Sequence, residues 1–230
     1  MLPIYGLQKT TLLDFPGHVA STIFLGHCNF RCPFCHNASL LTPTDNNIPY
    51  TWDSILIHLK KRKPVLEGVC ISGGEPTLHN ELPQRMKEIK SLGYLVKLDT
   101  NGTNPAMLAN LLENHLVDMV AMDIKNAPAN YTVSIGNVPF DLRKIQQSID
   151  LLLSSNIRYE FRTTLVREHH TETALLDIAK WLQGDSFYYL QNYKDSPDVR
   201  CPGLHGFNPS QLAHFQQVAK QYLPNTFIRG

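Results

Sequence analysis

The chain has 230 residues, of which 43% are hydrophobic and 18% are charged, and its formal net charge is +1. These ordinary values give no indication of a membrane span, an acidic tail or a nucleic-acid-binding patch. The segment 1–17 lacks the basic start and long apolar run of a signal peptide, and five cysteines is an odd number. We therefore expect a reducing, cytoplasmic location rather than a disulfide framework.

Strand and helix patterns alternate along the chain. A β-branched segment at 19–25 predicts a strand, and apolar residues at helical spacing predict a helix over 51–63, with Thr51 as its N-cap. The other predicted strands are 66–72, 94–99, 117–124, 157–166 and 186–192, and the other predicted helices are 81–92, 105–115, 140–155, 171–183 and 209–222. Six strands that alternate with helices predict parallel βαβ units in an α/β fold.

Three cysteines lie within eight residues, in the segment CNFRCPFC over 28–35. Cys28, Cys32 and Cys35 supply three thiolates on one short loop, with no obvious fourth. A cluster of four irons normally takes four cysteine thiolates, so three would leave one iron open. An open coordination position predicts a catalytic site rather than a structural one.

Two other interpretations of this loop compete with the cluster. The string CPFCH over 32–36 is the pattern of covalent haem attachment, but it leaves Cys28 unexplained and requires export. A structural zinc site would need a fourth ligand, either His36, which is awkward to aim at the same ion as the adjacent Cys35, or a residue distant in sequence. Cys201 lies in a predicted loop and is open to three roles: ligand of this metal, ligand of a second metal, or free thiol.

Polar residues and glycines follow the predicted strands at their carboxyl ends, where barrels of parallel strands carry their active sites. These residues are Asn37 after the cysteines, Gly73, Gly74 and Glu75, then Asp99 and Thr100, then Asp123 and Lys125, then Arg162, and finally Gln191. Adjacent glycines allow close approach of a backbone to a ligand. Each residue alone also fits a helix cap, a turn or a surface ion pair. His169 and His170 are expected to be solvated.

The cysteine loop and the Gly-Gly-Glu-Pro string at 73–76 together resemble the radical S-adenosylmethionine (SAM) superfamily. The strings GLQKT at 6–10, DFPG at 14–17 and CNFRCPFCHN at 28–37 resemble the activating enzymes of glycyl radical enzymes, above all those of anaerobic ribonucleoside-triphosphate reductase. The strings DTNG at 99–102 and DIK at 123–125 also resemble the pyruvate formate-lyase activating enzymes. The resemblance implies a partial, laterally open (β/α)6 TIM-like barrel. It also implies a single domain over 1–230, in which residues 1–17 form an extension or hairpin before the barrel.

The resemblance assigns roles to residues that match the family motifs. Cys28, Cys32 and Cys35 become the ligands of one [4Fe–4S] cluster. The residues implied to hold the amino group of SAM are Gly73, Gly74 and Glu75, and those implied to hold a monovalent cation are Asp99, Thr100 and Asp123. The other implied SAM contacts are Lys125, Arg162, Asn37 and Gln191. Gln191 departs from the family, because relatives carry a histidine in the comparable region.

The implied reaction is reductive cleavage of SAM to a 5′-deoxyadenosyl radical, which abstracts hydrogen from a backbone glycine of a partner enzyme. Anaerobic ribonucleotide reductase is the expected partner, and flavodoxin or ferredoxin the expected electron donor; no nucleic acid or membrane is expected. The alternatives are a pyruvate formate-lyase-type activase and a radical SAM enzyme for a small molecule, such as a deazapurine-type ring contraction. A zinc-binding interaction module is the alternative from a different class.

Overall fold

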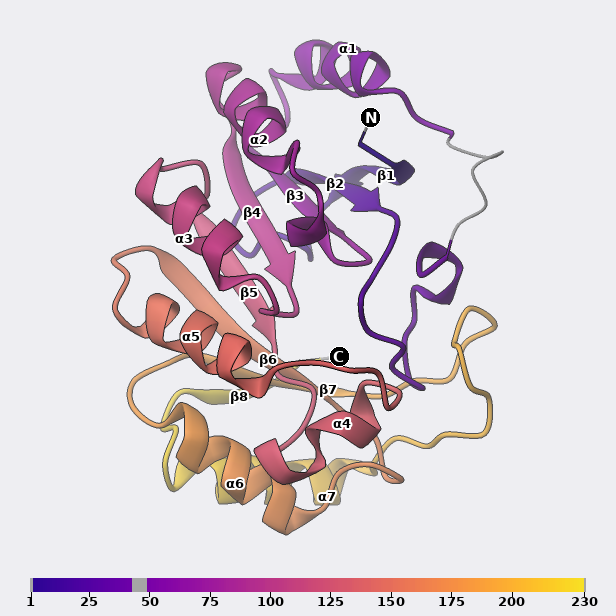
Figure 1. Ribbon diagram of the computed structural model, residues 1–230, viewed down its shortest axis with the longest axis vertical. Coiled ribbons are helices and arrows are strands. Elements are labelled where there is room, and N and C mark those ends of the chain that lie inside the picture. Colours follow the sequence, from indigo (N-terminus) through magenta and orange to yellow (C-terminus); the bar gives the residue numbers. More distant parts are fainter. Residues whose placement is uncertain (1, 43–48, 230) are drawn as a thin grey trace.

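The computed structural model describes residues 2–42 and 49–229. Within these residues the strands form one curved sheet, and the longer helices lie around its outside (Figure 1). The strands are β1 (Ile4–Thr11), β2 (Ala20–Leu25), β3 (Gly68–Gly73), β4 (Leu95–Thr100), β5 (Met119–Asp123), β6 (Arg158–Leu165), β7 (Tyr188–Asn192) and β8 (Thr226–Arg229). The helices of nine or more residues are α1 (Trp52–Arg62), α2 (Leu82–Ser91), α3 (Pro105–Glu113), α5 (Leu142–Leu153), α6 (Glu172–Leu182) and α7 (Pro209–Lys220), and α4 (Tyr131–Ser134) is a single turn.

The strands follow one another in chain order across the sheet, from β1 to β8. Strands β2 to β8 are parallel to their neighbours, and β1 pairs antiparallel with β2. The described residues contain no pairing of β1 with β8, so the sheet curves into a barrel that stays open on one side. The predicted α/β fold with an open barrel of parallel strands is therefore confirmed. The six predicted strands correspond to β2–β7, whereas β8 was not predicted.

Local sequence explains how the helices begin and end. The side chain of Thr51 accepts a hydrogen bond from the backbone N–H of Ser54 at 3.2 Å, which confirms it as the N-cap of α1. The last turn of α1 carries Lys60, Lys61 and Arg62, where cations suit the helix dipole. The other helix faces that point at the sheet are apolar, and α5 for example buries Ile145, Ile149 and Leu152 there.

The floor of the barrel is closed by Phe15, which belongs to the DFPG turn between β1 and β2. Its side chain packs with Ala20 and Met119 in a buried cluster that is separate from the main core. A Cβ atom on Gly68 would lie 2.7 Å from the Phe15 ring, so only glycine leaves room for this plug. The segment before the parallel strands thus fills the bottom of the barrel.

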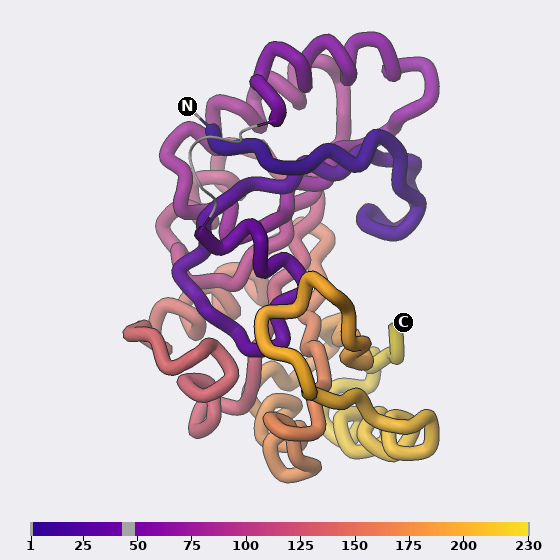
Figure 2. Tube along the Cα trace, turned by 90° about the vertical axis from the view of Figure 1, so that its right-hand side faces the viewer, coloured from indigo at the N-terminus to yellow at the C-terminus, as the bar shows by residue number. Residues whose placement is uncertain are grey.

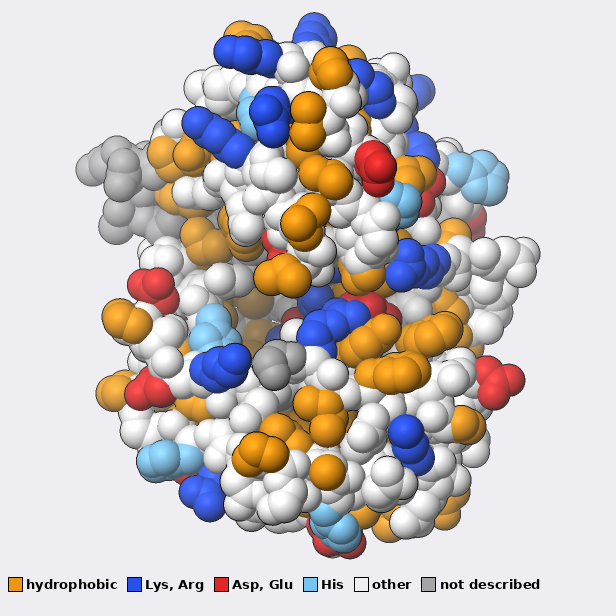
Figure 3. All heavy atoms as spheres, turned by 180° about the vertical axis from the view of Figure 1, so that it is seen from behind, with side chains coloured by type: hydrophobic (Ala, Val, Ile, Leu, Met, Phe, Trp, Pro, Cys, Tyr) orange, Lys and Arg blue, Asp and Glu red, His pale blue; other side chains and the backbone are white. Residues whose placement is uncertain are grey.

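The open side of the barrel is visible in two views. Figure 2 shows the turn between β1 and β2 on the same side of the molecule as β8 and the C-terminal end. Figure 3 shows that this face is hollowed near its middle, with acidic and basic side chains in the hollow. Among the described residues, no helix is both long enough and apolar enough to cross a membrane.

Candidate active site

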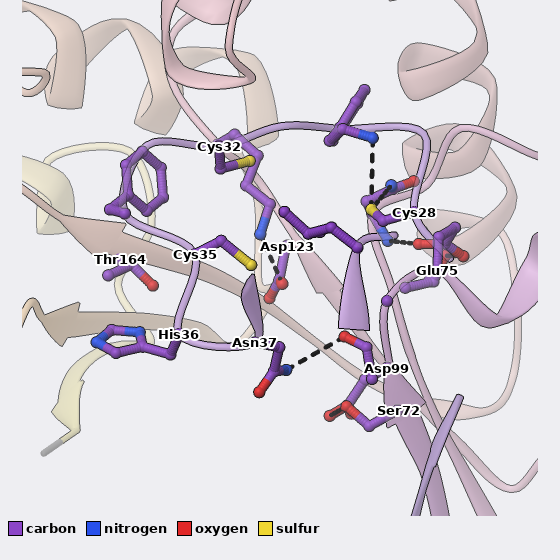
Figure 4. A pocket seen from close by; sticks show the side chains of 18 of the residues that line it. Cys28, Cys32, Cys35, His36, Asn37, Ser72, Glu75, Asp99, Asp123 and Thr164 are labelled. Carbon is purple, nitrogen blue, oxygen red and sulfur yellow. Dashed lines mark hydrogen bonds and ion pairs between the residues drawn. The ribbon is translucent and has the colours of Figure 1, made fainter. Parts of the chain in front are cut away.

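One pocket at the carboxyl ends of the parallel strands gathers nearly all the residues singled out from the sequence (Figure 4). Its lining includes Cys28, Cys32, Cys35, Asn37, Gly73, Gly74, Glu75, Asp99, Thr100, Asp123, Lys125 and Arg162. Parallel strands all end at the same edge of the sheet, which is why residues far apart in sequence meet here. Gln191 is the exception, because it lines a neighbouring pocket together with Thr164 and Arg229.

The two glycines join the end of β3 to the start of the cysteine loop. Gly73 has φ of +116°, and a Cβ atom there would lie 2.3 Å from the carbonyl oxygen of Leu25. A Cβ atom on Gly74 would lie 2.0 Å from the carbonyl oxygen of His27. The backbone N–H groups of Gly74 and Glu75 donate to those same two carbonyls, each at 2.8 Å. The glycines are therefore required for close backbone packing, whatever they bind.

The cysteine loop is also held from outside by two distant segments. The N–H of Arg31 donates to the carbonyl of Ile135, just after α4, at 2.9 Å. From the loop between β7 and α7, the guanidinium of Arg200 donates to the carbonyl of Arg31 at 2.5 Å. In the same loop the N–H of Cys201 donates to the carbonyl of Pro33 at 2.9 Å. Tertiary contacts thus fix the path of a loop that has little secondary structure of its own.

The three thiols provide the donor set that a cluster with one open iron needs. Cys28, Cys32 and Cys35 line the same pocket, whereas neither Cys70 nor Cys201 does. Burial raises the pKa of Cys28 to about 12 and that of Cys32 to about 11. The thiols of Cys28 and Cys32 are therefore protonated at neutral pH when no metal is bound, and binding of iron must displace their protons.

The zinc alternative does not fit this arrangement. In the part of the chain that the structure describes, no group of three or more His, Cys, Asp or Glu side chains could hold a single metal ion. His36, the neighbouring candidate for a fourth zinc ligand, has its Nε2 at 2.7 Å from the carbonyl of Lys194. Its ring points away from the Cys35 sulfur (Figure 4). An iron–sulfur cluster differs because each thiolate binds a separate iron.

The carboxylate of Glu75 is fully buried and is a hub of hydrogen bonds. It accepts from the N–H and hydroxyl of Thr77, at 3.0 and 2.5 Å, and from the Thr100 hydroxyl at 2.7 Å. It also accepts from the N–H of Asn101 at 2.6 Å, and the Asn101 side-chain amide lies 4.0 Å from the Cys28 sulfur. Burial raises the pKa of Glu75, although these hydrogen bonds oppose the shift. Glu75 thus fixes the loops after β3 and β4 beside a predicted cluster ligand.

Charged side chains in the lining of the same pocket form a network. Arg162 donates to Asp123 Oδ1 from two nitrogens, each at 2.9 Å, and lies 3.5 Å from Asp99. Lys125 donates to the other oxygen of Asp123 at 2.9 Å. Burial alone would raise the pKa of Asp123, but Arg162 and Lys125 outweigh it and lower that pKa to about 2. The aspartates are therefore ionised at neutral pH, and their charge is matched inside the protein.

Several residues of this region were not identified from the sequence. His170, expected to be solvated, is only 2% exposed: its Nδ1 accepts from the N–H of Val166, and its Nε2 donates to the carbonyl of Lys125 at 3.0 Å. Burial lowers the pKa of His170 to about 4, so it is neutral there. Lys97 was also missed, although a lysine two positions before Asp99 lies on the same face of a strand and could have signalled it.

Comparison with known proteins agrees with this site. The model of the radical SAM superfamily matches residues 22–182. A Methanocaldococcus jannaschii protein named as a glycyl-radical enzyme activating enzyme (MJ1227) is 31% identical over 98% of this chain and 95% of its own. The pyruvate formate-lyase-activating enzyme of Staphylococcus epidermidis is 27% identical over 59% of this chain and 58% of its own. The crystal structure of QueE from Escherichia coli covers 99% of this chain and 93% of its own, with a TM-score of 0.61 and 17% identity.

The likeness to QueE supports the fold alone, whereas the family match covers most of the chain and includes the cysteine loop. Membership of this superfamily implies a [4Fe–4S] cluster and SAM, and the three thiols of the pocket fit that cluster. The chain belongs to the radical SAM superfamily of enzymes, among the glycyl-radical enzyme activating enzymes.

Proposed function

We propose that this protein activates a glycyl radical enzyme by generating a radical on a backbone glycine, and that its partner is an anaerobic ribonucleotide reductase. The observation that carries the proposal is the composition of one pocket, which is lined by three thiols, the glycine motif and a charged network. The match over nearly the whole length of a relative named for glycyl-radical enzyme activation supports the type of partner.

In this proposal Cys28, Cys32 and Cys35 hold the cluster, and the glycine motif and the charged residues of the same pocket hold SAM. A [4Fe–4S] cluster with SAM bound supplies one-electron cleavage of SAM and thereby a 5′-deoxyadenosyl radical. Lys125 and Arg162 are cations suited to a carboxylate, and the hydrogen bonds of Glu75 keep the surrounding loops rigid. Asn37 donates to the carbonyl of Gly73 at 3.2 Å and so connects the end of the cysteine loop to the glycine motif.

Two of the predicted features, the SAM contact of Gln191 and the monovalent cation site, are revised in this proposal. Gln191 and Arg229 line the neighbouring pocket, and this pocket shares His36 and Thr164 with the main pocket. We therefore assign Gln191 to the path by which the substrate approaches. The monovalent cation implied by Asp99, Thr100 and Asp123 is left out, because the two aspartates already pair with cations and the Thr100 hydroxyl donates to Glu75.

The open side of the barrel supports a protein as the substrate. A glycine within a folded partner can reach the pocket only if its loop enters the barrel, and a closed barrel is filled by its own side chains. Here β1 and β8 are not paired within the described residues, and the face on that side of the molecule is hollowed near its middle in Figure 3. We further propose that residues 1–230 act as one domain. A cytoplasmic location and flavodoxin or ferredoxin as donor stay predictions.

The cluster assignment is tested with a matched pair of cysteine variants. Cys32→Ala removes a thiol that lines the pocket, and Cys201→Ala removes one that does not. After anaerobic reconstitution with iron and sulfide, we expect Cys32→Ala to lose most of its iron and all reductive cleavage of SAM. Cys201→Ala should keep both. Equal iron content and equal cleavage in Cys32→Ala and the unchanged protein would contradict the assignment.

The partner is tested by electron paramagnetic resonance. The reconstituted protein is mixed with SAM, a reductant and a candidate partner, and a glycyl radical signal is recorded. We expect the signal with anaerobic ribonucleotide reductase and its absence when the partner's radical glycine is replaced by alanine. A signal with pyruvate formate-lyase alone would replace the partner. The absence of a glycyl radical signal with both enzymes, together with turnover of a free small molecule, would overturn the proposed function.

A further inference from the structure

A lysine lies inside the barrel, directly beneath the pocket. Lys97 is on the inner face of β4, two residues before Asp99, and its side chain is only 1% exposed. Its ammonium contacts Asp99 Oδ1 and lies 3.9 Å from the sulfur of Cys70. Because a buried ammonium is costly unless it is paired, Lys97 and Asp99 must be regarded as one unit.

The partners of the two aspartates differ in their access to a ligand. Arg162 and Lys125 line the pocket and are among the proposed contacts of SAM. Lys97 does not line the pocket, and Ser72 further fixes Asp99 by donating to its Oδ2 at 3.0 Å. When Arg162 and Lys125 engage a ligand, Lys97 therefore remains as the cation that faces Asp99.

The electrostatics of Asp99 agree with this division. Burial by itself would raise the pKa of this carboxyl, but Arg162 and Lys97 more than offset burial and the pKa is lowered. Without Lys97, a ligand that drew Arg162 away would leave an ionised carboxylate buried with a single hydroxyl partner. Such a group either takes up a proton or recruits a cation from solution.

We propose that Lys97 is the built-in counterion and positioning residue of Asp99, so that SAM binding by this protein requires neither Na⁺ nor K⁺. The side chain supplies the positive charge that the family resemblance assigns to a monovalent ion. This inference rests on the proposed function of the pocket as a SAM site. Lys97 lies outside the sequence motifs that predicted the site.

The first test needs no variant. The affinity of the reconstituted protein for SAM is measured anaerobically by titration calorimetry, in NaCl, KCl and choline chloride at equal ionic strength. We expect the three dissociation constants to agree within about twofold, because no site for the small cation has to be filled. An affinity that rises tenfold or more when choline is replaced by Na⁺ or K⁺ would overturn the inference.

The second test asks whether removal of Lys97 creates a dependence on cations. Lys97→Met keeps an unbranched side chain that is one atom shorter and removes its charge. We expect SAM affinity to fall about tenfold or more in choline chloride, a loss of one buried ion pair, and to recover partly in NaCl or KCl but not in choline. A merely structural role would weaken binding equally in all three salts and would overturn the inference.

A double variant controls for general damage to the barrel. Lys97→Met/Asp99→Asn removes both charges, and we expect its SAM affinity, whatever its size, to be the same in the three salts. A cation dependence that persisted in the double variant would show that Asp99 is not the group served by Lys97. Because glycyl radical formation is not measured here, failure of these tests is distinguishable from failure of the proposed partner. If Lys97→Met does not fold, the salt series on the unchanged protein still decides.

Discussion

The lower and upper levels of the barrel interior differ sharply in chemistry. At the bottom, Phe15, Ala20 and Met119 form a buried apolar cluster. At the top, Asp99, Arg162 and their partners form a network of charges around the pocket. The two levels are built by the same strands, since side chains two positions apart share a face of a strand.

Strand β4 shows how the change is made. Its inner face carries Leu95, Lys97 and Asp99 in ascending order, and Leu95 packs on the floor cluster while Asp99 lines the pocket. Lys97 lies between the apolar and the charged level, because its aliphatic chain is buried within the barrel and its ammonium group contacts Asp99. Stability and chemistry are therefore separated by depth within the barrel. We expect substitutions at the two levels to have different consequences.

The largest expected effect is at the upper rim. In Gly73→Ala the new Cβ atom meets the backbone of Leu25 at 2.3–2.4 Å, in addition to adopting a left-handed φ. We expect a loss of more than about 4 kcal/mol in the free energy of unfolding, and low iron content after reconstitution, because the cysteine loop is displaced. Urea unfolding and iron analysis measure the two quantities.

Gly184→Ala is the matched control for Gly73→Ala. Gly184 has φ of +110° and nothing within 4 Å of its hypothetical Cβ atom, so its substitution introduces backbone strain alone. We expect a loss of about 1 kcal/mol and normal iron content. Similar losses in the two variants would show that the contact between Gly73 and β2 is unimportant.

The next effect tests the floor. Phe15→Ala removes a buried ring from the bottom of the barrel and should lower the free energy of unfolding by about 3–5 kcal/mol. Because the floor is remote from the pocket, we expect the SAM affinity of the folded protein to change less than about twofold. Urea unfolding and titration calorimetry provide the measurements. A large loss of SAM affinity in fully folded Phe15→Ala protein would contradict the proposed separation of stability and chemistry between the two levels.

The smallest of the three effects concerns the response of the upper level to acid. The folded pKa of Asp123 is about 2, below its ordinary value of 3.8, so its ionised form stabilises the fold above pH 4. That contribution, about 2 kcal/mol, should be lost as the pH falls from 4 through 2. Asp123→Asn should therefore flatten this part of the plot of unfolding free energy against pH.

The control for Asp123 is an aspartate in an exposed pair. Asp141 also has a lowered pKa, caused by its hydrogen bonds with Arg143, but both lie on the surface. The effect of Asp141→Asn should disappear at about 0.5 M salt, whereas the effect of Asp123→Asn should persist because its pair is partly shielded from ions. An acid response of Asp123 that is equally sensitive to salt would contradict its assignment to a buried network.

The sequence alone was enough to predict the alternation of strands and helices, the cysteine loop and the glycine motif. The sequence predicts strand and helix from periodicity and close backbone approach from adjacent glycines, whereas the crowding that requires glycine at 73 and 74 comes from the distant Leu25 and His27. It missed β8, whose four residues, Thr226–Arg229, are too short for a periodic signal. That strand exists because β7 offers an edge with free hydrogen-bonding groups.

Tertiary structure alone decided which charges meet. The partnership of Arg162 with Asp99 and Asp123 joins residues 39 or more positions apart across three strands, and no local pattern specifies such a contact. The burial of His170 and of Lys97 likewise depends on what the rest of the chain places around them. Local preferences act over a few residues, whereas burial and ion pairing are set by the whole fold.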